Sequence, residues 1–411
     1  MESNTRGPEL LPSYELLRER LSREAKVLQI VLSHSWGPAE QVAANDAQDL
    51  ASAGVNVRVV CLDGCPLHQI LKPDGNRLEV HAVEKGSGIS WLIRLRRVLF
   101  SHLLDGFNLI HIHQPFLLNW LGPLLWNQKG VGLVLTRHAQ EQKEGEGVLF
   151  KFLSRRLDFV MVTTQAGKRQ VLNEVALPEA RVGVVTLGLD FERFDPDKVD
   201  PQKQREAWGA SDSTIVVGMV GRIDPNKGQA TLIRAAAGLH RGEDEAQPDL
   251  KFVIVGEESL GRVSSYLEEL NEMVGQFRLE GKVHFAGYME ELPTVMSAFD
   301  LFVMPSRRET FGLVALEAMA MECPIVLSQG ENAAEIVGRQ EFGLLIRADD
   351  AFDLQLALRK LLGDPELRRR MGKRARAHVK RHYDRRVRLL RTLDIYDRVL
   401  QRRRLLARND L

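Results

Sequence analysis

Short, continuous apolar runs recur along this chain, and segments with a helical pattern separate them. A strand with one wet face would alternate apolar and polar residues, so continuous runs bounded by turn residues indicate strands buried on both faces of a parallel sheet. The helical segments between them, such as residues 39–53, predict right-handed crossover connections. The chain is therefore predicted to be an α/β protein with doubly wound parallel sheets. The predicted strands are residues 27–32, 56–62, 109–112, 132–135, 159–162, 214–220, 251–255, 283–285, 301–304 and 324–327.

The alternation of strands and helices breaks near Asp195-Pro196-Asp197 and restarts at Thr214. A chain of 411 residues is long enough for two domains of ordinary size, and a proline-rich, charged segment is typical of a linker. We therefore predict an N-terminal extension over residues 1–25, a Rossmann-like domain over 26–194, a second over 205–385, and a basic C-terminal helix over 386–411. The cations from residue 364 onward, Arg376 and Arg403 among them, are interpreted as a solvated face.

Composition narrows the function classes. The net charge is +1, and aromatic residues are sparse in the basic tail, so no nucleic-acid partner is expected. No apolar stretch approaches the ~18 residues of a membrane span, and the N-terminus lacks the layout of a signal peptide. Three cysteines, Cys61, Cys65 and Cys323, are an odd number and lie at no zinc-binding spacing. The expected location is the cytoplasm, with peripheral contact to the inner face of the membrane as an alternative.

The segment Gly221–Gly228 carries the first candidate binding residues. It directly follows a predicted strand, so Arg222 and Lys227 lie where open α/β sheets place their ligands. A guanidinium and an ammonium could hold a diphosphate and neutralise a leaving group. Two cations on a loop are equally typical of a solvated surface. The segment is not a Walker loop, because Lys227 precedes its glycine and no Gly-Lys-Ser/Thr word is present.

A second candidate segment runs from Met304 to Ala320. A strand ends at Met304, a loop with Glu309 follows, and a run of strong helix formers contains Glu317. Free amides in the first helical turn could bind phosphate oxygens with the help of the helix dipole. Two carboxylates beside such a turn would suit sugar and ribose hydroxyls. On spacing alone, Glu317 is interpreted more simply as an exposed helix residue.

These segments together resemble the retaining glycosyltransferases of family 4. The matching words are PSRRETFGLVALEAMA, VGRIDPNKG, FVIVGEE, VHFAGYM and EFGLLI, and the resemblance extends from about Lys26 to about Tyr383. The family's Glu-x7-Glu signature is matched by Glu309 and Glu317. The resemblance implies the GT-B fold, in which two Rossmann-like domains face each other across a cleft. It also implies that the C-terminal helix returns to the N-terminal domain.

The resemblance further implies transfer of a sugar from a UDP- or GDP-linked donor to an acceptor hydroxyl, with retention of the anomeric configuration and without a metal or other cofactor. Arg222 and Lys227 would contact the donor diphosphate, Glu317 the ribose, and Glu309 the hydroxyls of the donor sugar. The acceptor would be a glycan, a lipid-linked sugar or a small molecule, as in glycan, lipopolysaccharide or glycolipid biosynthesis. The remaining implied donor-binding groups are the amides of Thr310, Phe311, Gly312 and Leu313.

In the N-terminal half, the resemblance implies two further site residues. Gly37 belongs to the loop after the first strand, which approaches the donor, and His138 would lie near the donor sugar. His111 and His113 either line the acceptor cleft or are structural.

The chain departs from the family pattern at four positions where glycine is usual. These positions hold Pro38, Glu322, Glu331 and Asn332. Because glycine allows backbone to approach a ligand closely, the departures put the loop conformations and the sugar specificity in question.

Two segments of the N-terminal half are basic and amphipathic, residues 91–100 and 147–156. Such helices can lie on an anionic membrane surface, which would give access to a lipid-linked acceptor. They are equally typical of core helices that carry arginines on the wet face.

Two Rossmann-like halves also occur in other classes of protein. A nicotinamide-dependent dehydrogenase is disfavoured because the loop after the first strand has only Gly37 and no Gly-x-Gly-x-x-Gly word. A nucleotide-sugar epimerase would not be expected to carry the FGLVALEAMA block with its paired acids. A non-catalytic protein that binds nucleotide sugars remains an alternative, since the glycine positions have changed while the four charged residues are present.

Overall fold

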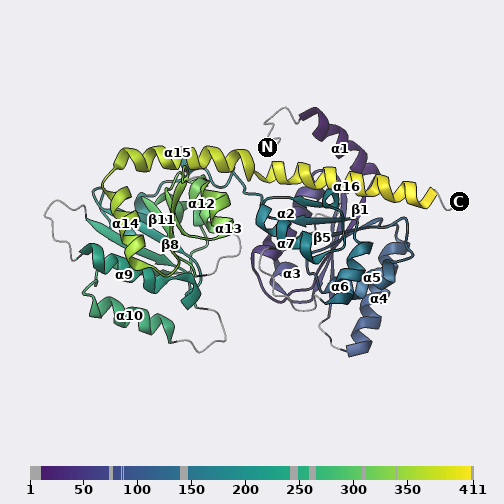
Figure 1. The fold of residues 1–411 in the computed structure, drawn as a ribbon, viewed down its shortest axis with the longest axis horizontal. Helices are drawn as coiled ribbons and strands as arrows, with labels where there is room; N and C mark the ends of the chain where they lie inside the picture. The colour runs from purple at the N-terminus through teal and green to yellow at the C-terminus, as the bar shows by residue number, and fades with distance from the viewer. Residues whose placement is uncertain are drawn as a thin grey trace. The chain divides into compact units, whose positions relative to one another are not determined.

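The computed structural model describes residues 11–73, 77–84, 86, 88–138, 147–240, 249–258, 265–307, 312–338 and 340–408. The chain forms two compact units (Figure 1). The N-terminal unit ends at Gly188 and takes up the chain again from Arg385, and the C-terminal unit is Leu189–Asp384. Among the described helices, none is both long and apolar enough to cross a membrane.

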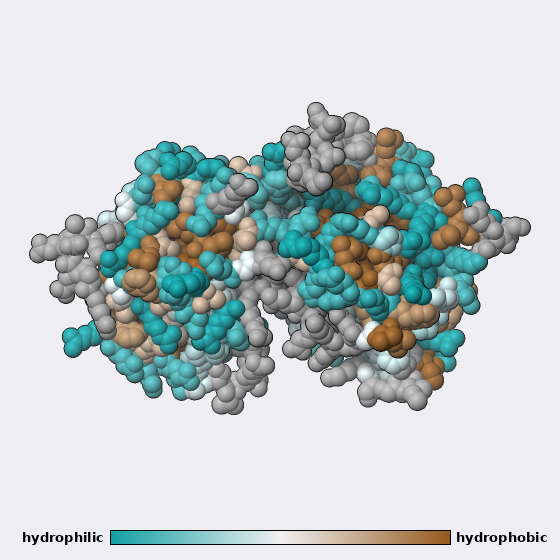
Figure 2. Space-filling view, viewed as in Figure 1, coloured by the Kyte–Doolittle hydropathy of each residue, from teal (hydrophilic) through white to brown (hydrophobic). Residues whose placement is uncertain are grey.

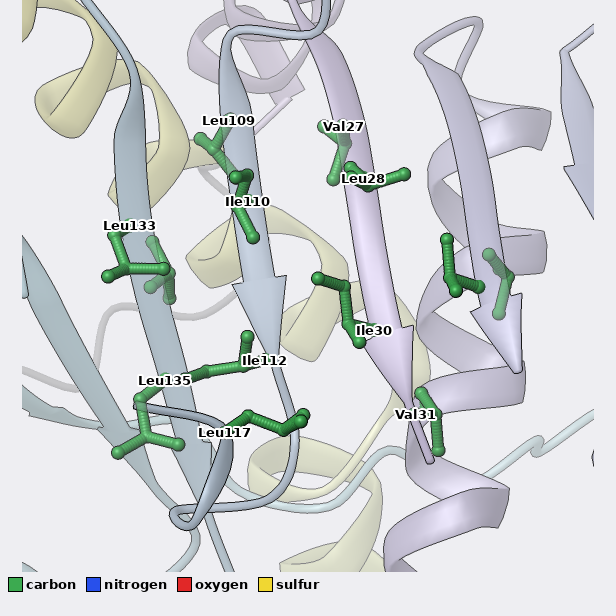
Figure 3. Packing of buried hydrophobic residues seen from close by; sticks show 14 of the residues in the cluster. Val27, Leu28, Ile30, Val31, Leu109, Ile110, Ile112, Leu117, Leu133 and Leu135 are labelled. Carbon is green, nitrogen blue, oxygen red and sulfur yellow. The ribbon is translucent and has the colours of Figure 1, made fainter. Parts of the chain in front are cut away.

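The N-terminal unit is built on a seven-stranded sheet in the order β3-β2-β1-β4-β5-β6-β7, and every pairing is parallel. Side chains of β1, β4 and β5 fill its core, among them the fully buried Ile30, Ile112 and Leu135 (Figure 3). Each such side chain contributes about 1.5–3 kcal/mol of stability. The strands are β1 (Lys26–Val31), β2 (Asn56–Leu62), β3 (Leu78–Val83), β4 (Leu109–Ile112), β5 (Gly132–Arg137), β6 (Phe159–Val162) and β7 (Val182–Val184).

The C-terminal helix belongs to this N-terminal unit, as the resemblance implied. It packs against α1, α2 and β5, and Figure 1 shows α1 beside it. The predicted N-terminal extension thus contains a helix that buries Leu21 in the core. The helices are α1 (Leu11–Glu24), α2 (Pro38–Ser52), α3 (Pro66–Ile70), α4 (Gly88–Leu104), α5 (Leu117–Leu125), α6 (Val148–Leu153), α7 (Gln165–Glu174) and α16 (Arg385–Arg408).

A buried ion pair joins α16 to α2. The guanidinium of Arg388 is 2% exposed, and its Nε and Nη2 each donate to a carboxylate oxygen of Asp46 at 2.6 Å. Its Nη1 also donates to the carbonyls of Val185 and Thr186, which follow β7. Arg388 therefore ties the returning helix to two other elements of the unit.

The prediction that the basic tail is a solvated face is wrong at the buried Arg388 and also at Arg376 and Arg403. Arg403 is buried and donates from Nε to Asp158 at 2.8 Å. Arg376, in the C-terminal unit, is half-buried and donates to the carbonyl of Phe194 at 2.9 Å. The sequence did not indicate that these arginines are buried. Their partners lie far away in the chain and come close only in the fold.

The C-terminal unit is built on a six-stranded parallel sheet in the order β10-β9-β8-β11-β12-β13. Helices α9 and α14 pack together, and α12 packs against α15. The strands are β8 (Ile215–Val220), β9 (Leu250–Val255), β10 (Val283–Gly287), β11 (Leu301–Met304), β12 (Ile325–Ser328) and β13 (Gly343–Ile346). The helices are α8 (Gln202–Ala207), α9 (Gln229–His240), α10 (Tyr266–Gln276), α11 (Leu292–Ser297), α12 (Leu313–Ala320), α13 (Glu331–Val337), α14 (Ala351–Leu362) and α15 (Pro365–His382).

The proline-rich segment interpreted as a linker lies inside the C-terminal unit, since that unit begins at Leu189. Arg376 of α15 holds the segment there through the carbonyl of Phe194 and an ion pair with Asp195 at 3.1 Å. The prolines correctly indicate a break between the two sheets. The contacts of Arg376 show that the segment packs within the C-terminal unit and does not form a separate linker.

Two of the altered glycine positions have a simple structural account. Glu331 opens α13 directly after its N-cap Gly330, where any residue fits. Glu322 differs, because it adopts φ +60°, the left-handed region that glycine occupies without cost. Its carbonyl lies so close to Gly372 of α15 that a Cβ added there would meet it at 1.9 Å. Position 322 therefore has the backbone conformation of a glycine, and the glutamate that occupies it is strained.

We predict that Glu322→Gly stabilises the C-terminal unit by about 0.5–1 kcal/mol. The left-handed conformation costs a non-glycine residue about 1–2 kcal/mol, and the greater freedom of glycine in the unfolded chain offsets part of the gain. Urea denaturation measures the change. Glu322→Ala is the matched control, since it keeps the Cβ and the strain. An equal gain in both variants would contradict the account.

We predict that Arg388→Met and Asp46→Leu each destabilise the N-terminal unit by about 3–5 kcal/mol, because each leaves one buried charge unpaired. The double variant should lose much less than the sum, since it removes both charges. A double-mutant cycle followed by urea denaturation measures this coupling. Strictly additive losses would mean that the two charges do not stabilise each other.

Candidate functional site

The candidate donor site of the C-terminal unit lies where its strand order reverses. Strands β8 and β11 are neighbours in the sheet, yet the chain forms β9 and β10 between them. Their connections leave in opposite directions, which opens a crevice at the carboxyl ends of the two strands. Arg222 and Lys227 follow β8, and Gly312, Leu313 and Glu317 follow β11. The fold thus brings together two segments that lie more than eighty residues apart in sequence.

Backbone contacts fasten the two segments to each other. The amide of Arg307 donates to the carbonyl of Asn226 at 2.8 Å, and the hydroxyl of Ser306 donates to the carbonyl of Lys227 at 3.4 Å. Gly228 has φ +87°, and a Cβ added to it would lie 2.2 Å from the carbonyl oxygen of Pro305. A glycine is therefore required where the two loops touch.

The loop that carries the two cations has a fixed conformation. The side chain of Asp224 accepts the amide of Asn226 at 2.8 Å and caps the short turn Pro225–Lys227. The carbonyl of Arg222 accepts from the buried Gln229 at 2.7 Å. The side chain of Arg222 is exposed and that of Lys227 is half-buried. Both positive charges are thus presented on an ordered backbone at the edge of the crevice.

Glu317 lies on α12 and is 8% exposed, so the simpler sequence interpretation, an exposed helix residue, is wrong. Its Oε2 has no hydrogen-bond partner among the described residues. Burial raises the pKa of its carboxyl to about 8, and the positive charge of Arg193 offsets this rise only in part. An unsatisfied buried carboxyl costs stability, and such groups concentrate at binding sites.

The start of α12 is shaped by Gly312. This residue is the N-cap, adopts φ +79°, and packs so that an added Cβ would lie 3.2 Å from Cε of Met304. Leu313 is the first helical residue and is half-buried. The predicted partners Glu309, Thr310 and Phe311 lie outside the described residues, so their predicted roles remain predictions.

In the N-terminal unit, Gly37 is the N-cap of α2 and has an extended backbone. Its amide donates to the carboxylate of Glu40 at 2.9 Å, and Pro38 opens the helix. The group predicted to reach a donor is thus engaged by an acid three residues on. Sequence reasoning did not single out Glu40, although a glutamate three residues after an N-cap is a known capping signal.

His138 follows β5 and is 9% exposed, with its Nε2 unpartnered in the described part of the chain. Burial, together with the neighbouring His113 and Arg388, lowers the pKa of His138 to about 3. The imidazole is therefore neutral near neutral pH and can exchange hydrogen bonds but carries no charge. Its ring stacks on that of His113 with centroids 6.2 Å apart.

The structure separates the other two histidines by their surroundings. His111 is fully buried and bonded at both ring nitrogens, to the hydroxyls of Tyr396 at 2.6 Å and Thr136 at 2.7 Å. His113 is equally buried, but neither ring nitrogen has a partner among the described residues. Gln29 of β1 is likewise buried and unpartnered there, and sequence reasoning missed it. Its signal was a polar residue in an otherwise apolar strand.

Two family models together match most of the chain. The model for Glycosyl transferases group 1 matches residues 200–378, and the model for Glycosyltransferase Family 4 matches residues 36–193. Each of the two units thus carries one of the matches.

Comparison with individual proteins points the same way. A D-inositol 3-phosphate glycosyltransferase of Corynebacterium urealyticum is 33% identical over 296 residues, or 67% of this chain and 68% of that protein. Another, of Stackebrandtia nassauensis, is 35% identical over 227 residues; the match covers 54% of this chain and spans half, 50%, of that relative's length. The crystal structure of Anabaena HepE in complex with UDP has a TM-score of 0.77 over 90% of this chain and 99% of that chain, at 20% identity, and therefore supports the GT-B fold.

We predict that Glu317→Gln stabilises the ligand-free C-terminal unit by at least about 1 kcal/mol at pH 8.5. The folded-state pKa is raised from 4.5 to about 8, so the folded state binds a proton that the unfolded state has released. The wild type therefore loses stability as pH rises from about 4.5 to about 8, and the glutamine variant is spared this loss.

Urea denaturation of both proteins at pH 5 and pH 8.5 measures this difference. The gain should be clearly smaller at pH 5. The matched control is Glu272→Gln, at an exposed position of α10 in the same unit. A gain that is equal at both pH values would mean that Glu317 does not titrate as a buried acid.

Proposed function

We propose, from the premise that this chain belongs to glycosyltransferase family 4, that it transfers a sugar from a nucleoside diphosphate sugar to an acceptor hydroxyl. One observation carries the proposal. At the reversal between β8 and β11, a loop with two cations is hydrogen-bonded to residues 306 and 307 ahead of α12, and α12 buries Glu317, whose Oε2 has no partner among the described residues. Cations suit the charge of a diphosphate, and a hydrogen-bonding group shielded from bulk water suits a ribose hydroxyl.

In the proposed complex, Arg222 and Lys227 hold the diphosphate oxygens, and the amides at the start of α12, from Gly312 and Leu313, add to this stabilisation. Glu317 binds the ribose hydroxyls. Glu309, with the amides of Thr310 and Phe311, is assigned to the donor sugar from the family resemblance. A relative of the same fold, HepE, has been solved with UDP, which is consistent with a uridine donor.

We propose that the reaction retains the anomeric configuration and that no metal takes part. The bond from the anomeric carbon to the diphosphate breaks, and the acceptor oxygen bonds that carbon from the same face. The departing diphosphate oxygen takes the proton of the acceptor. Arg222 and Lys227 stabilise the negative charge that develops on the leaving group. His138, neutral because of its lowered pKa, supplies a hydrogen bond to the substrates rather than a charge.

The acceptor is proposed to be a glycan or a lipid-linked sugar. The support is the basic amphipathic character of α4 and α6, which would allow peripheral contact with an anionic membrane. A lipopolysaccharide core mannosyltransferase of Rhizobium meliloti, 32% identical over 53% of this chain, is a relative named for such a pathway.

We predict that one nucleotide class stabilises the protein when UDP, GDP, ADP and their sugar conjugates are compared by thermal unfolding. At a ligand concentration about a hundredfold above Kd, the gain is about 2.7 kcal/mol, or roughly 5–10 °C in Tm. Lys227→Ala and Glu317→Ala should each reduce the shift, since loss of a hydrogen bond to a charged group weakens binding by roughly tenfold or more.

The matched control is Lys203→Ala, which removes an exposed cation from α8 of the same unit. No shift with any nucleotide, or equal shifts in all variants, would contradict the proposed donor site. Release of the nucleoside diphosphate from the sugar conjugate on prolonged incubation separates an enzyme from a protein that only binds. An inverted anomeric centre in the product would overturn the retaining mechanism.

A further inference from the structure

Three helices of the N-terminal unit, α4, α5 and α6, expose a set of large apolar side chains. We call this surface the α4–α6 face. Leu149 is 61% exposed, Ile93 55% and Trp120 49%. In Figure 2, hydrophobic side chains gather on the part of this unit where Figure 1 labels these helices. An apolar surface of this kind, rimmed by charges, marks an interaction site rather than an ordinary wet face.

The face is continuous because its helices touch. The indole of Trp126, just after α5, stacks on the ring of Phe152 in α6 with centroids 5.3 Å apart and planes 10° apart. Gly122 of α5 packs directly on Leu153. The basic segments 91–100 and 147–156 of the sequence thus form one surface with α5, which the sequence did not single out.

A groove of about 440 Å³ runs between α4 and α5. One wall is formed by Ile93, Leu99 and Phe100, and the other by Trp120, Leu121 and Leu124. Arg96 is the charged residue among those that line it. A volume of this size can hold a small ligand, and the apolar walls offer it no set of polar partners.

The charge around the groove is mostly positive, and Glu84 pairs with Arg94 of α4 at 2.6 Å. Residues 88–104, 113–138 and 147–157 contain no aspartate or glutamate. The exposed cations of this surface include Arg96, Arg97, Lys151 and Arg155. The guanidinium of Arg96 lies 5.5 Å from the ring centroid of Phe100, and that of Arg155 lies 5.6 Å from that of Phe152. Cations beside aromatic rings at the surface are suited to the boundary between acyl chains and anionic headgroups.

We propose that the α4–α6 face docks on an anionic phospholipid bilayer and that the groove between α4 and α5 receives one acyl chain of a phospholipid. Arg96, at the groove, pairs with the phosphate of that lipid. The inference rests on the membrane contact proposed above and adds its surface, its ligand and its binding groove.

The docking step is tested with the full chain and vesicles of equimolar phosphatidylglycerol and phosphatidylcholine, by co-sedimentation at low salt. Binding is expected, and vesicles of phosphatidylcholine alone should bind far less. The double variant Arg96→Gln, Arg97→Gln should bind roughly tenfold or more weakly. The control Arg370→Gln, Lys373→Gln removes two exposed cations from α15 in the other unit and should bind like the wild type.

The groove is tested on the vesicle-bound protein with a phosphatidylglycerol that carries a photoreactive diazirine within one acyl chain. Adducts are expected on both walls, in peptides containing Ile93–Phe100 and Trp120–Leu124. Adducts confined to α6, or none, would overturn the groove while leaving the membrane contact intact.

Failure of the wild type to bind anionic vesicles would overturn both the docking proposal and the membrane contact. A concentration-dependent dimer that Leu149→Ser, Phe152→Ser abolishes would show that a second copy covers the face, and would overturn docking on a bilayer. Neither result would affect the nucleotide-induced thermal shift, so the proposed donor site is judged separately.

Discussion

Both units of this protein depend on a reversal of strand order at the centre of an all-parallel sheet. In the N-terminal unit the reversal lies between β1 and β4, and in the C-terminal unit it lies between β8 and β11. Right-handed crossovers on the two sides of such a pair must run in opposite directions, so their loops diverge and leave a crevice. Arg222 lies on the loop after β8 and Glu317 on the helix after β11, so both follow strands of this pair although they are far apart in sequence. The position of the candidate donor site is thus a consequence of topology before it is one of chemistry.

The N-terminal unit needs a second constraint, because its last helix follows the whole C-terminal unit in the sequence. The buried pair of Arg388 and Asp46 meets this need by joining α16 to α2 and to the backbone after β7. The charge of Arg388 also lowers the pKa of His113 and His138. Burial is the larger cause of both shifts, and at His138 the negative charge of Asp46 opposes the effect of Arg388.

The sequence predicts every inner strand and the edge strand β10, and it misses the other three edge strands for a physical reason. Inner strands are buried on both faces and read as continuous apolar runs. Strand β3, at one edge of its sheet, mixes buried and exposed positions, and β7, at the other edge, has only three residues. Strand β13, at an edge of the second sheet, begins with a glycine. None of these three carries the pattern on which the prediction depends.

The candidate site divides in the same way. Arg222, Lys227 and Glu317 could be found from the family words, because those words also encode the loops that hold them. The burial of Glu317 and the unpartnered state of Gln29 could not be predicted. Each depends on which segments the fold packs around the residue, and a single sequence contains no record of that packing.

The buried and the exposed ionisable groups of the proposed donor site have different roles. Burial acts on an acid and on a base in the same sense, since it favours the neutral form of both. In the C-terminal unit it raises the pKa of Glu317 to about 8, so this carboxyl is largely protonated near pH 7. A neutral carboxyl can both donate to and accept from ribose hydroxyls, and it places no negative charge close to a diphosphate that would repel it. Arg222, by contrast, is exposed on an ordered loop, where the proposed site needs a cation for the phosphates. One crevice can therefore bind a doubly charged group and a neutral sugar side by side, because the fold buries one set of residues and leaves the other at its edge.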